Sequence, residues 1–332
     1  MRVQHSPSPS TGRRPPSART LVVWGAVTAL MLTLLGGWVV SSHTGPDATA
    51  ATTPPSAKSH DALSLPWPEE GQASVVDTVS GRSGSSGAQR PVPIASVAKV
   101  MTAHVILSGR PLAEGESGPL VTVDRRAQDE SFSGSESTVI VHAGQRFSQR
   151  QLLEMLLLPS GNNIARLLAR WDAGGEAAFT AKMNRAAADL GMTRTTYTGA
   201  SGIEPTTTST SDDQLRLARA VMRDPVFREI VGTREVTVGQ GVGTIANTNR
   251  LLGTNGVVGV KTGSSTPAGG ALMWAATATG EDAGAVDDRT GKGLILGVVL
   301  HQAPDTNPAQ GLQRAFDVTE RLVAAAQRGA RR

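Results

Sequence analysis

The chain has 332 residues, of which 39% are hydrophobic and only 3% aromatic, so a large core must be built mainly from aliphatic side chains. It contains no cysteine, which excludes disulfides, thiolate metal sites and thiol nucleophiles. The net charge of +4 comes from the N-terminal tail: removing the four arginines of residues 1–40 from the 32 basic residues leaves 28, equal to the 28 acidic ones. Basic patches interleaved with aromatics are absent, so nucleic acid is not an expected partner.

The N-terminal segment predicts export. Residues 1–19 are rich in Ser, Pro and Arg, which is typical of a disordered tail. The run Leu21–Val40 holds 20 residues without a charge, enough at about 1.5 Å per residue to cross a bilayer core of about 30 Å. Because arginines precede it, the positive-inside rule places residues 1–19 in the cytoplasm and the body outside the cell.

We therefore expect a single-pass anchor in the cell membrane over residues 20–40, followed by a Pro/Thr/Ala-rich linker over 41–64. A cleaved signal peptide remains the alternative, with a small-residue site at Ala48–Ala50. Its apolar region would usually span about 7–15 residues, which favours the anchor.

In the body, residues 65–328, apolar residues recur with the period of a strand in some segments and with the period of a helix in others. Residues 73–79 predict a half-buried strand, and 95–107 a helix with Ser96 near its start. A strand is expected over 138–142, and a helix over 150–158 that ends at Pro159 and Gly161. Further helices are predicted over 164–171, 176–190, 212–223 and 309–327, and further strands over 234–238, 257–262, 272–279 and 294–300. This order indicates an α+β fold, an antiparallel sheet with helices on its faces.

Three short motifs carry the chemistry: Ser96-Val97-Ala98-Lys99, Ser160-Gly161-Asn162 and Lys261-Thr262-Gly263. Positions i and i+3 share a helix face, so Lys99 Nζ can reach Ser96 Oγ. A serine hydroxyl needs a base to become a nucleophile, and a lysine with a pKa near 10.4 is charged and cannot be that base. Burial and the positive charge of Lys261 would both lower the pKa of Lys99.

The other two motifs fit positioning roles. Ser160 and Asn162 lie on a tight turn, where Ser160 can relay a proton to the leaving amine and Asn162 can hold Lys99 and the substrate amide. Lys261 and Thr262 can bind a substrate carboxylate, while Gly263 permits the close approach of a substrate backbone. Each motif alone is weak evidence, but the three in this order are strong.

The chain resembles the D-alanyl-D-alanine carboxypeptidases, the low-molecular-mass penicillin-binding proteins. The resemblance rests on the segments IASVAKVMTA (94–103), LLLPSGNNIARLLA (156–169), MNRAAADLGMTRTTYTGASGI (183–203), NTNRLLG (247–253) and GVVGVKTGSSTPAGGAL (256–272). It implies a β-lactamase/transpeptidase-like fold in which the active site lies between a sheet and a helical cluster. It also implies a Ser96 acyl-enzyme, no cofactor, peptidoglycan stem peptides and β-lactam antibiotics as partners, and an oxyanion hole from the backbone N–H groups of Ser96 and Ser264.

Two departures from the family pattern are visible. Asn163 stands where the family usually has Asp, which removes a charge close to the site, and Ser264-Ser265 replaces bulkier residues. The six histidines form no metal-ligand pattern with carboxylates, so no metal site is predicted.

We conclude that the sequence predicts a serine-type D,D-carboxypeptidase. A D,D-endopeptidase acting on cross-bridges and a non-catalytic cell-wall binding protein of the same fold remain alternatives. A β-lactamase is disfavoured, because no Glu-x-x-Leu-Asn-like segment lies between Asn162 and Lys261.

Overall fold

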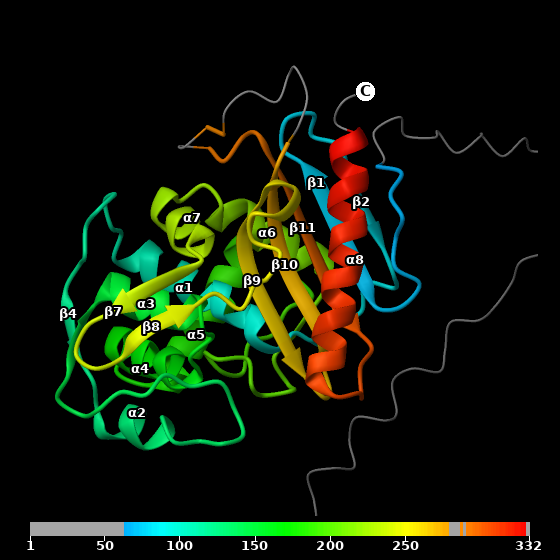
Figure 1. Cartoon of the computed structure of the whole chain (residues 1–332). Coiled ribbons are helices and arrows are strands. Elements are labelled where there is room, and N and C mark those ends of the chain that lie inside the picture. The colour runs from blue at the N-terminus through cyan, green and yellow to red at the C-terminus, as the bar shows by residue number, and fades with distance from the viewer. Residues whose placement is uncertain (1–62, 279–285, 288–289, 330–332) are drawn as a thin grey trace, which may run out of the picture. The chain divides into compact units, whose positions relative to one another are not determined.

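The computed structural model describes residues 63–278, 286–287 and 290–329 (Figure 1). The chain divides into two units, residues 1–57 and 58–332, and all described residues belong to the second. The expected tail, the expected anchor over 20–40 and nearly all of the expected linker lie outside the described residues. Among the residues that are described, no helix combines the length and the apolar character needed to cross a membrane.

A five-stranded antiparallel sheet organises the body, with strand order β2-β1-β11-β10-β9. Its strands are β1 (Gln72–Asp77), β2 (Ser83–Ser86), β9 (Val257–Ser265), β10 (Gly269–Thr277) and β11 (Leu294–Gln302). Strands β1 and β11 pair with each other, and their register runs from Gln72↔Leu300 to Asp77↔Ile295. The antiparallel sheet expected from the sequence is therefore confirmed, and β9 forms one of its edges.

Helices cover both faces of this sheet. Alternate strand residues point into two separate cores, one shared with α8 (Pro308–Gly329) and the other with the helical cluster. Figure 1 shows α8 lying along the strands. The expectation that the first strand is half-buried is wrong, since all six residues of β1 are buried. Within it, Ser74 Oγ lies 2.8 Å from Ser211 Oγ and donates to Asp212 Oδ1 at 2.6 Å.

The helical cluster packs around α1, which contacts α3, α4, α5 and α6. Its helices are the 3₁₀ helix η1 (Ala95–Ala98), α1 (Lys99–Gly109), α2 (Arg125–Glu130), α3 (Gln149–Leu157), α4 (Asn162–Ala173), α5 (Glu176–Asp189), α6 (Ser211–Val221) and α7 (Pro225–Gly232). Side chains define several starts: Ser148 and Gln151 form a capping box at α3, and Asp224 caps α7. The helices predicted from periodicity are all present, while α2 and α7 were not predicted.

Three two-stranded ribbons and one further turn complete the fold. They are β3 (Val92–Pro93) with β6 (Thr208–Ser209), β4 (Leu120–Thr122) with β5 (Arg146–Ser148), β7 (Glu235–Val238) with β8 (Gly243–Ala246), and the 3₁₀ turn η2 (Thr254–Gly256).

The prediction of a strand over 138–142 is wrong, because this segment forms no strand in the structure. The main chain of Val139 bonds the Asn163 side chain, and the Val141 N–H bonds Ser131 Oγ. Val139 and Val141 are buried while Ile140 is 60% exposed, so the alternation in the sequence reflects burial without sheet pairing.

Candidate active site

Ser96 and Lys99 lie at the junction of η1 and α1. Lys99 is fully buried, whereas Ser96 is partly exposed. Lys99 Nζ donates to Ser96 Oγ at 2.8 Å, to the Ser201 carbonyl at 2.8 Å and to Asn162 Oδ1 at 2.5 Å. The spacing of three residues thus brings the amine to the hydroxyl, and two further acceptors fix it there. The arrangement presents an accessible hydroxyl to solvent and keeps its neighbouring amine dry.

The second motif forms the sharp connection between α3 and α4. Ser160 has a φ of +69°, a left-handed conformation that a non-glycine residue rarely adopts. Gly161 is the N-cap of α4, and Asn162 is the first residue of that helix. Ser160 Oγ is buried and finds no hydrogen-bond partner among the described residues. A buried hydroxyl without a partner is able to bind an incoming group.

The third motif lies on the edge strand β9. Lys261 is buried and donates to the Thr262 carbonyl at 3.1 Å, while Thr262 Oγ1 lies 2.6 Å from Thr248 Oγ1. A Cβ on Gly263 would lie 2.9 Å from the Ile94 carbonyl and 3.1 Å from the Ser96 nitrogen. Only a glycine therefore lets β9 approach the nucleophile segment this closely.

These contacts place the site between β9 and the helical cluster, as the sequence resemblance implied. Ser264 follows Gly263 on the same strand, pairs with Gly270 of β10 and is partly exposed. The three motifs come from η1, the α3–α4 connection and β9 (Figure 1).

The electrostatics of the site favour a neutral Lys99. Burial, reinforced by the positive charge of Lys261, holds the pKa of Lys99 well below its ordinary value, and Arg166 acts in the same direction. Glu136 and Glu204 oppose this by raising the pKa of Lys99. Burial also lowers the pKa of Lys261, to about 7. In the neutral form the two N–H groups of the amine can serve the Ser201 carbonyl and Asn162 Oδ1, and its lone pair, 2.8 Å from Ser96 Oγ, is able to accept the hydroxyl proton.

Several residues around Lys99 were missed by sequence reasoning. Ser201 contributes only a backbone carbonyl, which carries no signal in the residue type. Glu136 lies in a polar loop 26 positions before Asn162. Glu204 is partly buried, and its Oε2 has no partner among the described residues. Thr248 could have been identified from the sequence, since it lies in the NTNRLLG segment that carries the family resemblance.

Asn163, where a lost charge was noted, points away from Lys99 into the loop between α2 and β5. Its Nδ2 donates to the carbonyls of Val139 at 2.8 Å and Ala127 at 3.2 Å, and Oδ1 accepts from the Val139 N–H at 3.1 Å. A carboxylate could not donate to these carbonyls, so the amide suits this position.

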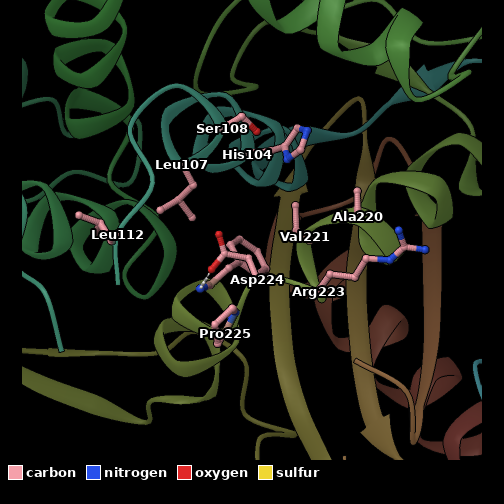
Figure 2. A pocket seen from close by; sticks show the side chains of 10 residues that line it. His104, Leu107, Ser108, Leu112, Ala220, Val221, Arg223, Asp224 and Pro225 are labelled. Carbon is pink, nitrogen blue, oxygen red and sulfur yellow. Dashed lines mark hydrogen bonds between the residues drawn. The ribbon is translucent and has the colours of Figure 1, made fainter. Parts of the chain in front are cut away.

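A separate cleft of about 370 Å³ lies between α1, the end of α6 and the start of α7 (Figure 2). It contains His104, whose pKa is lowered by burial, and Asp224, whose Oδ1 is occupied by capping α7. None of the motif residues lines it. Within residues 63–278, 286–287 and 290–329, no three His, Asp or Glu side chains converge as metal ligands would.

Comparison with known proteins decides the family. The family model of D-alanyl-D-alanine carboxypeptidases matches residues 66–287. The chain belongs to the D-alanyl-D-alanine carboxypeptidase family. Membership confirms the resemblance seen in the sequence and makes the chain a penicillin-recognising serine peptidase. It also fits a peptidoglycan substrate and β-lactam binding.

Two relatives of this carboxypeptidase family differ in their described activity. A D-alanyl-D-alanine carboxypeptidase of Streptomyces sp. (strain K15) is 33% identical over 202 residues, 56% of this chain and 68% of the relative. A D-alanyl-D-alanine endopeptidase of Pseudomonas aeruginosa is 32% identical over 241 residues, 69% of this chain and 73% of the relative. The crystal structure of the Streptomyces K15 DD-transpeptidase superposes with a TM-score of 0.65 at 27% identity, covering 79% of this chain and all of that one. The predicted fold is thereby confirmed, while the roles of individual residues stay predictions.

Proposed function

We propose that this peptidase removes the terminal D-alanine from peptidoglycan stem peptides through an acyl-enzyme on Ser96. The observation that carries this is the buried Lys99, whose amine lies 2.8 Å from Ser96 Oγ and whose pKa is held well below its ordinary value. Lys99 takes the hydroxyl proton as Ser96 Oγ bonds the carbonyl carbon of the D-alanyl-D-alanine bond. The carbon–nitrogen bond breaks, and water later hydrolyses the ester.

The surrounding residues have distinct parts in this proposal. Ser160, with its unpaired buried hydroxyl, passes the proton to the leaving amine, and Asn162 holds Lys99 and the substrate amide. Lys261 and Thr262 bind the terminal carboxylate of the substrate. The backbone N–H groups of Ser96 and Ser264 receive the developing oxyanion, and Gly263 lets β9 approach the backbone of η1.

Labelling with a fluorescent penicillin tests the nucleophile. The wild-type body should label covalently, and Ser96→Ala should not, while its thermal unfolding curve stays close to that of the wild type. Loss of labelling in a folded variant also excludes a non-catalytic binding protein of the same fold. Residual labelling on another serine would contradict the assignment of Ser96.

An endopeptidase acting on cross-bridges is the second candidate, because the Pseudomonas aeruginosa endopeptidase matches a larger share of this chain than the Streptomyces carboxypeptidase. Hydrolysis rates for a defined pentapeptide and for a cross-linked dimer, measured with the same preparation, separate the two. We expect the pentapeptide to be the better substrate; the reverse order would assign the chain to the endopeptidases.

We also propose that residues 20–40 anchor the enzyme in the cell membrane, with the catalytic body outside the cell. The support is the uncharged run Leu21–Val40 behind an arginine-bearing tail. Full-length protein should stay in the membrane fraction after a carbonate wash. Release of a mature form that begins near Ala51 would show cleavage instead.

A further inference from the structure

A carboxylate from outside the three motifs reaches the catalytic cluster. Glu136 lies in the α2–β5 loop, residues 131–145, and its side chain is 13% exposed. Its Oε2 accepts from Asn162 Nδ2 at 2.6 Å, and its Oε1 accepts from Arg166 Nη2 at 2.7 Å. Asn162 in turn presents Oδ1 to Lys99. Arg166, Glu136, Asn162 and Lys99 therefore form one continuous chain of hydrogen bonds.

This chain determines which way the Asn162 amide faces. A carboxamide has one oxygen that accepts and one nitrogen that donates, and either can point toward Lys99. With Glu136 on one side, only the donating nitrogen is compatible with the carboxylate, so the oxygen must face the lysine. The opposite orientation would set Asn162 Oδ1 against the Glu136 carboxylate and leave Lys99 facing two N–H donors.

Glu136 is itself held in place from α4. Arg166 lies one helical turn after Asn162, on the same helix face, and donates to both oxygens of Glu136. Arg166 also donates to Glu130 Oε2 at 2.9 Å. Although burial alone would raise the pKa of Glu136, the hydrogen bonds from Arg166 and Asn162 lower it below its ordinary value. The side chain is therefore a carboxylate at neutral pH.

The loop that carries Glu136 is tied to α4 on both sides of it. Asn163 Nδ2 donates to Ser131 Oγ at 3.1 Å and to the Val139 carbonyl at 2.8 Å, and the Asn162 N–H donates to the Ser137 carbonyl at 2.8 Å. These bonds fix the position of Glu136 beside Asn162.

We propose that Glu136 is a positioning residue for the reaction: it holds the Asn162 carboxamide with its oxygen toward Lys99 and lends the site its negative charge. This inference rests on the proposed role of Lys99 as the base. The charged groups that act on Lys99 come from several elements: Lys261 of β9 and Arg166 of α4 lower its pKa, while Glu136 and Glu204 of the loops raise it. Without Glu136, the pKa of Lys99 falls further.

The test is the second-order rate of acylation by a chromogenic penicillin, measured across pH. A lysine base is active in its neutral form, so the rate rises with pH through the pKa of Lys99 and then levels off. Glu136→Gln keeps an acceptor for Asn162 but removes the charge, so the rising limb should move to lower pH. Glu136→Ala removes both, so the limb should move likewise, and the plateau should fall about ten- to a hundredfold because the amide is free to turn.

Glu130→Gln is the matched control, because Glu130 also accepts from Arg166 but does not contact Asn162. It should leave both limb and plateau unchanged. An unmoved limb in Glu136→Gln, or an unchanged plateau in a folded Glu136→Ala, would overturn the proposal; the isosteric Gln variant suffices if the Ala variant does not fold. A wild-type rate with no rising limb would contradict instead the role of Lys99 as the base.

Discussion

Replacing Lys261 with methionine should change how the free energy of unfolding depends on pH. Burial lowers the pKa of Lys261 from 10.5 to about 7, so between these values the unfolded chain holds a proton that the folded chain lacks. Wild-type stability should therefore rise with pH through this window by about 1.4 kcal/mol per pH unit from this residue alone. Over the whole window the gain is on the order of 5 kcal/mol.

The sign follows from which state binds the proton. Below about pH 7 both states are protonated, and the cost of burying a charged Lys261 is present in full. As the pH rises toward 10.5, that cost is lost, because the folded chain is already neutral at this position. Methionine has a side chain of similar shape and no ionisable group, so the stability advantage of Lys261→Met should be greatest at low pH and shrink steadily as the pH rises.

The measurement is denaturant unfolding of the body, followed by circular dichroism at several pH values for the wild type and for two variants. Lys261→Arg is the control: a guanidinium keeps its proton, so this variant should fall progressively behind the wild type as the pH rises. A stability difference between the wild type and Lys261→Met that stays constant between about pH 7 and pH 10 would refute the reasoning, since Lys261 would then be charged in the folded protein.

Three further substitutions test the site. Lys99→Arg should lose acylation by a chromogenic penicillin, because a guanidinium cannot take the Ser96 proton; normal acylation would show that Lys99 is not the base. Gly263→Ala should lower the same rate about ten- to a hundredfold, since the added Cβ would lie 2.9 Å from the Ile94 carbonyl and push β9 away; an unchanged rate would contradict this close approach. Asn163→Asp should lower the free energy of unfolding by about 1–3 kcal/mol in a denaturant titration, because its donor to the Val139 carbonyl is lost, and equal stability would count against that hydrogen bond.

Short-range patterns in the sequence were sufficient to predict much of the secondary structure and part of the candidate site. Ser96 and Lys99 meet because residues three apart share a helix face, which requires no knowledge of the rest of the fold. Periodicity located β9, β10 and β11, and the helices α1, α3, α4, α5, α6 and α8, because each must bury an apolar face. The three motifs, read together, identified the family before any fold was in view.

The contact between Lys99 and Asn162 was expected from the motifs, but only the tertiary structure decided what else surrounds Lys99. Its acceptor Ser201 is 102 positions away, and the charge of Glu136 reaches it through Asn162 from a loop. No local pattern marks such contacts, because they depend on which loops pack together. The same cause explains why the prediction of a strand over 138–142 is wrong. The buried and exposed residues alternate there in a loop that is hydrogen-bonded to Asn163 and Ser131, and not in a strand. The periodicity of a segment's sequence indicates which of its faces is buried. Which other segment packs against that face is decided only in the tertiary structure.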